Sequence, residues 1–528
     1  MAAGHEAAVK SSGHVGKPLT DNHSRPVRSR IRECVSYHPG ATVIFRGVTL
    51  WRVIRVPAPV RAQLCWALPV LTAAFVVAYQ AAEPELWRDE FASWSAATRT
   101  GPEIFEMGRH IDGVLVPYYL LLHLWIGWFS DSAAAMRVPS IAAMALTAGA
   151  VALLGRRLWG NRAGLFGGLL FAVLPVVSRY GQEIRGYALA TLFATVATLL
   201  LIEALDRARW WLWVAYGLAV ALTGLSHLLA LLVLAGHLVI VASTRKADWR
   251  WLVAVGGGLA VVLPLTVRGL GQHAAQLAWL DRASPAALAD LPNAIFEAPV
   301  LGGAVPAVAV AALRRGRAFD AGLLWAAVLL PVGLLYAYDQ WVAPVFVGRY
   351  LLFCVPLLCA LAGTALTALR LPLALAVLAA LAAIGVPAQE RFRDPHSRYA
   401  YAAAAEVVLE NQRAGDAIVY APRDGWQLVD VGLEYYLRDR EPHDVLLAAD
   451  QRATRSLWAA ECTDALRCLG GTSRVWVVAA DNLDPPFRAN PTNQLRYEVK
   501  AALGEFEQLA VWRVDGFTVA LFVRPPRV

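Results

Sequence analysis

The sequence lacks the patterns that mark nucleic-acid-binding and metal-binding proteins. Its formal net charge is +8, but the basic residues are scattered between apolar runs and form no single stripe with interleaved aromatic residues. The basic excess is therefore better explained by membrane topology than by a nucleic-acid partner. The six cysteines show no metal-ligand spacing. Cys34 lies in the N-terminal tail, Cys65, Cys354 and Cys359 lie in apolar segments, and Cys462 and Cys468 lie in a polar C-terminal region.

The sequence predicts no cleavable secretion signal, and the apolar content indicates a membrane protein. Hydrophobic residues make up 58% of the sequence, against roughly 45 to 50% in ordinary soluble domains. Residues 1–60 contain few acidic residues, and the apolar run that follows has no small-residue cleavage site of the expected kind. We therefore predict that this region is a basic cytoplasmic tail. Its arginines are Arg25, Arg28, Arg30, Arg32, Arg46, Arg52 and Arg55.

Apolar runs long enough to cross a bilayer recur between residues 61 and 390. A transmembrane helix needs about 20 mainly apolar residues, so the runs predict a mainly α polytopic membrane module with about 11 transmembrane helices. The predicted crossings lie near residues 63–82, 138–154, 163–180, 187–205, 210–226, 228–243, 251–267, 299–313, 320–338, 350–369 and 371–388.

Lysine and arginine fall mainly on alternate turns between these runs. With the N-terminus inside, the inner turns contain Arg156, Arg157, Arg162, Arg207, Arg209, Arg245, Lys246, Arg250, Arg314, Arg315, Arg317 and Arg370. The short outer turns contain far fewer basic residues, namely Arg185, Arg268, Arg282 and Arg349. This is the positive-inside bias expected of a correct topology.

The same topology requires that residues 117–129, PYYLLLHLWIGWF, do not cross the membrane. The run is short, and its tyrosine, histidine and tryptophan residues favour an interface. We therefore predict an interfacial helix on the outer surface, within a first outer loop of residues 83–137. If the run crossed, every later turn would invert and the arginines would lie outside.

Residues 395–528 differ in character from the rest of the chain. A helical stretch, AYAAAAEVVLENQ, is followed by short β-rich runs, DAIVYAP, RVWVVAA, LAVWRV and FTVALFV, which predict a small α/β domain. An odd number of crossings makes this domain extracytoplasmic. Cys462 and Cys468 would then lie where disulfides are permitted and could pair, although two unpaired thiols fit the sequence equally well.

Polar and ionisable residues gather at the predicted outer turns. They are Asp89 and Glu90 after the first crossing, Asp112 in the first outer loop, Gln182, Glu183, Arg185 and Tyr187 after the third crossing, His227 at a hairpin tip, and Arg349 and Tyr350 at a helix end. A solvated charge pair, a helix cap, a simple turn, a hydrogen-bonded histidine or a snorkelling arginine would also explain them. Arg185 and Arg349 oppose the positive-inside bias, which favours a role other than orientation. Together, carboxylates and arginines at one bilayer face could hold an anionic lipid head group and a hydroxylic acceptor.

Several stretches resemble a known family. They are WRDEFASWSAATR, HIDGVLVPYYLLLHLW, RVPSIAAMALTAGAVALLGRRLWGNRAGLFGGLLFAVLPVVSRYGQEIRGYAL and GRYLLFCVPLL. With these, the chain resembles the polyprenyl-phosphate-sugar-dependent glycosyltransferases of the C fold, in the protein O-mannosyltransferase and aminoarabinose-transferase-like branch. It is most similar to actinobacterial integral-membrane mannosyltransferase-like proteins. The clear resemblance covers residues 85–240.

The resemblance implies a catalytic carboxylate in the first outer loop, matched by Asp89 with Glu90 beside it. It also implies a second acidic position after the third crossing, matched by Glu183. The family often has aspartate at this second position, so the glutamate leaves the metal question open. We expect no required cofactor, although a divalent cation would fit some members of the family.

The function that follows is transfer of mannose or another hexose or pentose from a polyprenyl-phosphate donor to a hydroxyl acceptor, with inversion, at the outer face of the plasma membrane. In this hypothesis Asp89 is the base, and Arg349 and Arg185 bind the departing lipid phosphate. The remaining candidates, Glu183, Asp112, His227, Tyr350, Gln182 and Tyr187, would bind or orient substrate. The acceptor would be a protein, a lipid or a glycan. A lipid or polysaccharide transporter and a non-catalytic membrane assembly protein are the alternative classes.

Overall fold

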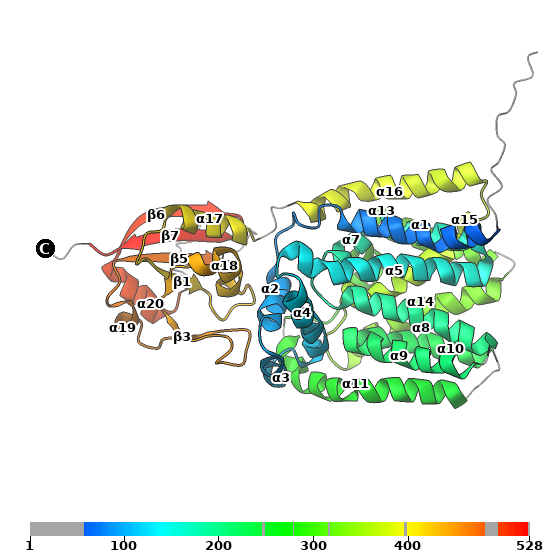
Figure 1. Ribbon diagram of the computed structural model, residues 1–528, viewed down its shortest axis with the longest axis horizontal. Coiled ribbons are helices and arrows are strands. Elements are labelled where there is room, and N and C mark those ends of the chain that lie inside the picture. The colour runs from blue at the N-terminus through cyan, green and yellow to red at the C-terminus, as the bar shows by residue number, and fades with distance from the viewer. Residues whose placement is uncertain are drawn as a thin grey trace, which may run out of the picture. The chain divides into compact units, whose positions relative to one another are not determined.

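The computed structural model describes residues 58–207, 209–244, 249–277, 279–314, 317–394, 399–480 and 495–525. The predicted cytoplasmic tail, residues 1–60, lies almost entirely outside these described residues, as does Cys34. Within residues 56–528, which form one compact unit, a bundle of long helices precedes a smaller α/β domain (Figure 1). The predicted fold class, a mainly helical polytopic membrane protein with a small α/β domain at its C-terminal end, is therefore confirmed.

A helix or helix pair occupies every predicted membrane crossing. The elements of the bundle are α1 (Ala58–Ala78), α5 (Ala133–Trp159), α6 (Asn161–Val173), α7 (Pro175–Gly181), α8 (Tyr187–Arg207), α9 (Trp210–Ser226), η2 (Leu228–Leu232), α10 (Val233–Ser243), α11 (Trp249–Gln276), α12 (Pro285–Phe296), α13 (Pro299–Val310), η3 (Ala311–Arg314), α14 (Ala318–Trp341), η4 (Gly348–Cys354), α15 (Val355–Leu366) and α16 (Leu371–Arg393). Seven helices of the described chain are long and apolar enough to cross a membrane, or up to 9 if each bent pair is one span. Because α9 and α10 are shorter, the predicted number of about 11 crossings stays a prediction.

Both bent pairs break immediately before a proline. Leu174 and Ala298 have extended backbone angles, and each is followed by a proline that begins the next helix. The proline ring disfavours helical angles in the residue before it. This explains the 62° bend between α6 and α7 and the 94° bend between α12 and α13.

Small residues bring the central helices close together. Every residue of α15 is buried, and this helix packs against α6. A Cβ atom added to Gly363 of α15 would lie 2.3 Å from the backbone nitrogen of Gly167 in α6. Without a hydrophobic driving force between helices in lipid, such close backbone contact is a main source of packing energy.

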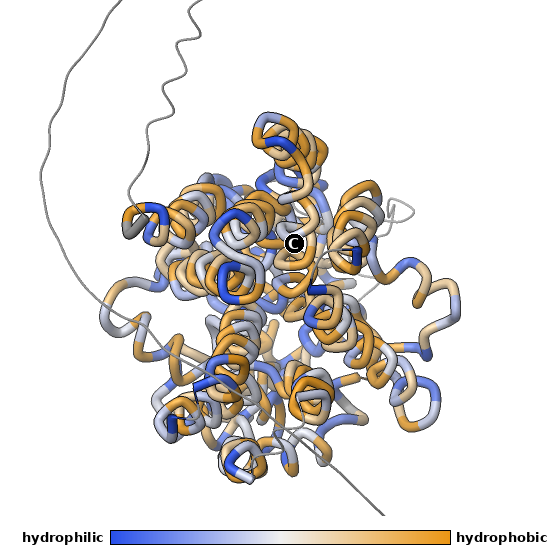
Figure 2. Tube along the Cα trace, turned by 90° about the vertical axis from the view of Figure 1, so that its right-hand side faces the viewer, coloured by the Kyte–Doolittle hydropathy of each residue, from blue (hydrophilic) through white to orange (hydrophobic). Residues whose placement is uncertain are grey.

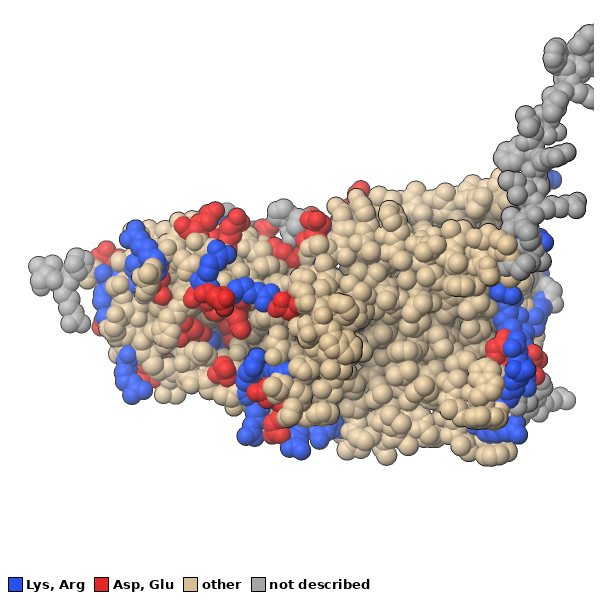
Figure 3. All heavy atoms as spheres, viewed as in Figure 1, with Lys and Arg blue, Asp and Glu red and all other residues tan. Residues whose placement is uncertain are grey.

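The predicted inner turns meet at one end of the bundle, which we name the arginine-rich end. There Arg157 of α5 pairs with Glu203 and Asp206 of α8, and the Arg317 side chain donates to the Leu158 carbonyl. Figure 3 shows charged side chains at this end and a broad uncharged zone beside it, and Figure 2 shows the mostly hydrophobic helices end-on from the same side. The charge distribution matches a membrane-spanning bundle.

The first outer loop forms three helices at the opposite end of the bundle, which we name the loop end (Figure 1). They are α2 (Arg88–Ala97), α3 (Gly101–His110) and α4 (Val116–Trp128), with the short η1 (Gly113–Leu115) before α4. The predicted helix at residues 117–129 is therefore present, and α4 packs on α2, α3 and α5. Its place on the membrane surface stays a prediction.

The predicted α/β domain is built around one mixed sheet. Its elements are α17 (Tyr401–Asn411), β1 (Ala417–Ala421), α18 (Val429–Leu437), η5 (Arg438–Arg440), β2 (His443–Asp444), β3 (Leu447–Ala449), β4 (Ala460–Glu461), α19 (Ala465–Leu469), β5 (Arg474–Ala480), α20 (Tyr497–Ala502), η6 (Leu503–Glu505), β6 (Glu507–Val514) and β7 (Phe517–Val523). The five-stranded sheet has the order β2-β1-β5-β7-β6. β1 pairs in parallel with β2 and β5, whereas β7 pairs antiparallel with β5 and β6.

Alternate side chains of the central strands pack against helices on opposite faces of this sheet. Ile418 and Tyr420 of β1 share a core with Val408 of α17, whereas Val419 shares a core with Leu469 of α19. Successive strand side chains point to opposite faces, so a strand that is buried throughout requires cover on both sides.

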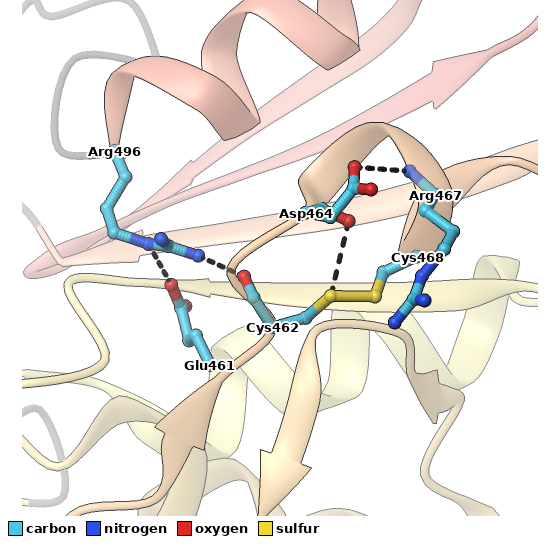
Figure 4. Close-up of a disulfide and its surroundings, with 6 residues drawn as sticks. All are labelled: Glu461, Cys462, Asp464, Arg467, Cys468 and Arg496. Carbon is cyan, nitrogen blue, oxygen red and sulfur yellow. Dashed lines mark hydrogen bonds and ion pairs between the residues drawn. A yellow bond between two sulfur atoms is a disulfide. The ribbon is translucent and has the colours of Figure 1, made fainter.

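Cys462 and Cys468 form a disulfide in this domain (Figure 4). The bond joins the end of β4 to α19, whose first turn is capped by the Asp464 side chain. Arg496 stabilises the same region, because it donates to the Cys462 carbonyl at 2.7 Å and forms an ion pair with Glu461. The other cysteines of the described chain, Cys65, Cys354 and Cys359, are free and buried.

The α/β domain packs on the helices of the first outer loop. The Phe91 ring of α2 lies 4.6 Å from the Tyr401 ring, and the Leu86 amide donates to the Tyr436 hydroxyl. Ion pairs and backbone contacts extend the interface to α3 and to the α4–α5 turn. Contacts with the α/β domain therefore hold the loop that carries the predicted catalytic carboxylate.

Candidate active site

A cavity of about 720 Å³ lies at the loop end of the bundle. Its polar lining comes mainly from the predicted outer turns, and its apolar lining comes from leucines of η2, α11 and α14. Seven of the predicted site residues line this cavity, namely Asp89, Asp112, Arg185, Tyr187, His227, Arg349 and Tyr350. The tertiary structure thus brings together residues that are separated by up to 261 positions in the sequence, from Asp89 to Tyr350. Glu90, Gln182 and Glu183 do not line this cavity.

Asp89 lies in the first turn of α2 and faces the cavity. The helix begins there because Glu90, its third residue, caps the preceding backbone by accepting from the Trp87 amide. The Asp89 side chain is 23% exposed and lies 3.8 Å from both Arg88 and Arg185. A carboxylate in the first turn is stabilised by the positive end of the helix dipole. Asp89 is therefore a carboxyl group that is accessible from the cavity.

Glu90 points away from the cavity and forms a buried ion pair with Arg137 of α5. The two groups lie 3.2 Å apart, and each side chain is 2% exposed. Glu90 also accepts from the Ile184 amide at 3.0 Å, while Arg137 donates to the carbonyls of Ala81 and Pro84. These contacts join the start of α2 to two other segments. These contacts place Glu90 outside the cavity lining, and the catalytic role predicted for it beside Asp89 stays a prediction.

Arg185 and Asp112 belong to one chain of hydrogen bonds. Arg185 donates to the Tyr119 hydroxyl at 3.2 Å, and that hydroxyl donates to Asp112 at 2.6 Å. The second oxygen of Asp112 accepts from the Gln276 side chain at 2.9 Å. Burial raises the pKa of the Asp112 carboxyl, and the Arg185 charge and the Tyr119 hydrogen bond oppose this rise. Asp112 makes no side-chain cap to the helix that follows it, so the alternative of a simple capping residue does not fit.

Gln182 and Glu183 lie behind the cavity wall. The Gln182 side chain donates to the carbonyls of Val77 and Tyr79 at the end of α1. Glu183 is buried, and neither of its carboxylate oxygens has a hydrogen-bond partner, although Arg179 lies 3.9 Å away. Burial raises the Glu183 pKa to about 7, with Arg179 opposing the rise and Asp89 adding to it. Glu183 is thus a buried carboxyl group that does not line the cavity.

Two tyrosine rings of the cavity lining lie beside His227. The imidazole lies 5.3 Å from the Tyr187 ring and 5.0 Å from the Tyr350 ring. Burial and the nearby Arg349 charge lower the His227 pKa to about 4. The histidine is therefore neutral at physiological pH and can donate or accept a hydrogen bond there.

Arg349 makes no hydrogen bond or ion pair with any residue that the structure describes, and its Nε is buried without a partner. Its guanidinium lies over the rings of Trp279 and Tyr350, at 5.8 and 5.6 Å from their centroids. Aromatic faces attract a cation without occupying its N–H donors. Arg349 therefore has free donors for an anion in the cavity.

The carboxylates of the cavity do not fit a divalent cation. Asp89 has two guanidinium groups beside it, and both oxygens of Asp112 accept hydrogen bonds. Within the described chain, no group of three or more His, Cys, Asp or Glu side chains is placed to hold a metal ion. A cation that prefers several oxygen ligands would here face positive charges instead.

Several residues of the site could not be singled out from the sequence. Tyr119 was predicted only as part of an interfacial helix, and Gln276 lies at the end of a long apolar helix. Trp279 and Arg88 also line the cavity, and Trp426 reaches it from the α/β domain. Tyrosine and tryptophan are ordinary at membrane interfaces, so no local signal distinguished these positions.

The bundle, the first-loop helices and the α/β domain define a known class of membrane fold. The chain is similar to the crystal structure of ArnT from Cupriavidus metallidurans in the apo state, at 15% identity and a TM-score of 0.56, over 88% of this chain and 100% of that chain. ArnT bound to undecaprenyl phosphate is 16% identical with a TM-score of 0.57 over the same shares. AglB from Archaeoglobus fulgidus, an oligosaccharyltransferase solved with an inhibitory peptide and a dolichol-phosphate, is more distant, at 13% identity and a TM-score of 0.40 over 86% and 74%.

Residues 114–267 match the family model for dolichyl-phosphate-mannose-protein mannosyltransferases. This segment contains Arg185, Tyr187 and His227 of the cavity. No curated protein sequence matches the chain. The predicted resemblance to polyprenyl-phosphate-sugar glycosyltransferases of the C fold is borne out, whereas the actinobacterial branch stays a prediction.

Proposed function

We propose that this protein is a membrane glycosyltransferase that transfers a sugar from a polyprenyl-phosphate donor to a hydroxylic acceptor. One observation carries the proposal: a single cavity contains an accessible carboxylate, Asp89, and an arginine without an acidic partner, Arg349. The family match over residues 114–267 and the fold shared with ArnT, which was solved with undecaprenyl phosphate, support a lipid phosphate as part of the donor. The sugar would be mannose or another hexose or pentose.

In the proposed reaction Asp89 removes the proton of the acceptor hydroxyl. The oxygen of that hydroxyl attacks the anomeric carbon of the donor at the same time. The bond between that carbon and the phosphate oxygen breaks, and its electron pair leaves with the polyprenyl phosphate. A single displacement inverts the anomeric centre. A positioned general base contributes a rate factor of about 100 to 10,000.

The departing lipid phosphate needs positive charge more than it needs a proton, because it leaves as a stable anion. Arg349 fits this role, since its planar guanidinium matches phosphate oxygens and its donors are free. Arg185 supplies a second positive charge beside Asp89, held there by Tyr119 and Asp112. Asp112 therefore acts in this proposal by positioning Arg185.

The apolar part of the cavity suits the isoprenoid chain of the donor. Its wall includes Leu228, Leu232, Leu270, Leu334 and Leu335. Burying each methylene of a hydrocarbon chain contributes about 0.8 kcal/mol. The lipid chain would thus supply binding energy, while the sugar and phosphate reach the polar part of the same cavity.

We further propose that the loop end faces the outside of the plasma membrane and the arginine-rich end faces the cytoplasm. The three proposed domains are the cytoplasmic tail of residues 1–60, the membrane module of residues 61–390 and the extracytoplasmic domain of residues 395–528. The Cys462–Cys468 disulfide supports this orientation, because disulfides persist in oxidising compartments. The arginines beside Asp89 support a transfer that needs no divalent cation.

Turnover by purified protein in proteoliposomes tests the proposal. Radiolabelled polyprenyl-phosphate mannose is supplied with a cell-envelope fraction as acceptor, with and without a chelator. We expect wild-type protein to transfer label in both conditions, and Asp89→Asn to fold and insert normally but lose at least about 100-fold in rate. The matched control is Asp206→Asn, which removes an exposed acid at the arginine-rich end and should leave the rate unchanged.

Other outcomes would favour the alternative classes. Movement of labelled lipid across the bilayer without transfer would indicate a transporter, and neither transfer nor movement would indicate an assembly protein. An Asp89→Asn variant with the wild-type rate would remove Asp89 as the base.

A further inference from the structure

One tryptophan of the α/β domain lines the cavity beside the catalytic groups. Trp426 is the one lining residue, among the described residues, that comes from beyond the membrane module. It is 41% exposed, although large aromatic residues in this domain are mostly buried in its cores. The fold therefore directs an apolar ring into a space that also contains Arg88 and Asp89.

The loop that carries Trp426, residues 422–428, is anchored at its start by a buried charge cluster. Arg423 is 3% exposed and pairs with Asp444 at 2.7 Å, Glu461 at 3.2 Å and Asp430 at 3.6 Å. Three carboxylates from separate elements thus surround one guanidinium. Breaking such buried pairs is costly, so this end of the loop is held in one position.

The other end of the loop and the Trp426 ring have supports of their own. The Tyr401 hydroxyl donates to the Gln427 carbonyl, and the Tyr401 ring packs on Phe91 of α2. Trp458 donates to the Gly425 carbonyl at 3.1 Å and meets the Trp426 ring edge-on at 4.8 Å. Trp458 thus holds the Trp426 ring from one side, and the contacts through Tyr401 join the loop to the helix that carries Asp89.

We propose that Trp426 is an aromatic platform that binds a sugar ring of a carbohydrate acceptor, placing its hydroxyl toward Asp89. This inference rests on the proposed function. A pyranose or furanose ring has an apolar C–H face that packs on an indole and an edge of hydroxyl groups that need hydrogen bonds. The cavity provides both, because the Trp426 ring and the charged groups of Arg88 and Asp89 line the same space.

The position of Trp426 assigns it to the acceptor rather than to the donor. The leucines that suit the isoprenoid chain belong to η2, α11 and α14 of the bundle, and Arg349 lies in the first turn of η4 of the bundle. Trp426 belongs to the α/β domain, which lies beyond the first-loop helices. A lipid-linked donor reaches the cavity from the bilayer, so the side formed by the α/β domain is left for the second substrate.

Acceptor kinetics with full-length protein in nanodiscs test the platform. The donor is radiolabelled polyprenyl-phosphate mannose, and the acceptors are a panel of hexose and pentose oligosaccharides and a serine- and threonine-rich peptide. We expect Trp426→Ala to raise the KM for an oligosaccharide acceptor about tenfold, and Trp426→Phe to restore most of the loss. The dissociation constant of undecaprenyl phosphate should not change. Tyr497→Ala is the matched control, because Tyr497 is an aromatic residue of the same domain that is 82% exposed and lies away from the cavity.

Three results would overturn the platform. They are an unchanged oligosaccharide KM in Trp426→Ala, an equal loss of undecaprenyl phosphate binding, and transfer to the peptide alone with no effect of the substitution. If wild-type protein transfers sugar to nothing, the proposed function fails, and oligosaccharide binding measured by saturation-transfer NMR then decides the platform separately. Binding that Trp426→Ala abolishes would support it, and absence of binding by wild-type protein would overturn it.

Discussion

Arg349 differs from the other arginines near the cavity because no acidic side chain of the described residues lies within ion-pair distance of it. Arg88 and Arg185 both lie near Asp89, and Arg179 lies between Glu183 and Glu297. An arginine without a partner in a largely apolar cavity is unfavourable unless an anion compensates it. The arrangement is therefore typical of a site that binds an anion reversibly.

Removing this guanidinium should weaken binding of the lipid phosphate. Hydrogen bonds to charged groups contribute about 1.5 to 3 kcal/mol, so Arg349→Ala should raise the dissociation constant of undecaprenyl phosphate by about 10- to 100-fold. Arg349→Lys should recover part of the affinity, because an ammonium keeps the charge but loses the bidentate geometry. Isothermal titration in detergent measures both, with Arg207→Ala at the arginine-rich end as the control. Equal affinity of Arg349→Ala and wild-type protein would contradict the phosphate role.

Glu183 should make stability depend on pH. Its pKa in the folded protein is about 7, against an ordinary value of 4.5, because burial disfavours the charged form. As pH rises from 4.5 to 7, the unfolded chain loses this proton while the folded chain retains it, so folding stability falls by an amount of the order of 3 kcal/mol.

The neutral variant Glu183→Gln should escape this loss. We expect it to unfold at a higher temperature than wild-type protein at pH 8, with a difference that shrinks toward pH 4.5. Thermal unfolding followed by tryptophan fluorescence measures the difference, and Asp206→Asn, which changes an exposed acid, should show no such trend. A shift of the same size at both pH values would argue against titration of Glu183.

The start of α2 shows how one helix turn separates two adjacent carboxylates. Side chains of consecutive helical residues point about 100° apart, so Asp89 and Glu90 cannot face the same space. Asp89 faces the cavity, and Glu90 faces Arg137 in the protein interior. In the first-loop motif we therefore propose Asp89 as the base and Glu90 as a positioning residue.

Breaking the buried pair should affect stability as well as activity. Removing one partner of a buried ion pair costs about 3 to 5 kcal/mol, so Glu90→Ala and Arg137→Ala should lower the unfolding temperature and reduce transfer together. Glu90→Gln should retain part of both, because it still accepts from the Ile184 amide. Asp89→Asn should reduce transfer without a change in unfolding temperature. If Glu90→Gln instead loses transfer at an unchanged unfolding temperature, Glu90 is a direct participant in the chemistry.

The helical elements were largely predictable, whereas their bends were not. Continuous apolar runs flanked by arginines predict helices near the right positions, and each predicted crossing is helical. Pro175 and Pro299 favour the two breaks, but proline alone does not predict a break, because Pro139 and Pro331 lie inside helices that continue past them.

For the whole molecule, the separation of charge between the two ends determines the orientation we propose. In intact cells, a membrane-impermeant maleimide should label Tyr497→Cys in the α/β domain and should not label Asp206→Cys at the arginine-rich end. Both positions are exposed, and the free cysteines of the described chain are buried. Both variants are made in a Cys34→Ser background, so that Cys34 does not contribute to the labelling. Labelling of Asp206→Cys before cell lysis would reverse the topology.

Part of the candidate site was visible in the sequence because its residues are unusual where they occur. Asp89, Arg185, His227 and Arg349 are polar residues at the ends of apolar runs, and all four line the cavity. Trp426 lies in an ordinary α/β domain loop more than 330 positions from Asp89. Its approach to the cavity results from the packing of that domain on the first outer loop, which local patterns do not encode.

The sequence by itself determined the membrane-spanning character, the positions of most bundle helices, the grouping of basic residues on alternate turns and the four strands β1, β5, β6 and β7 of the α/β domain. These follow from local hydropathy, charge and periodicity, which act over one helix or one strand. Only the tertiary structure decided that Glu90 pairs with Arg137, that Glu183 and Gln182 lie behind the wall, and that Arg349 has no acidic partner. Such contacts join segments that are distant along the chain, and their energies depend on burial and geometry that arise only when the helices pack.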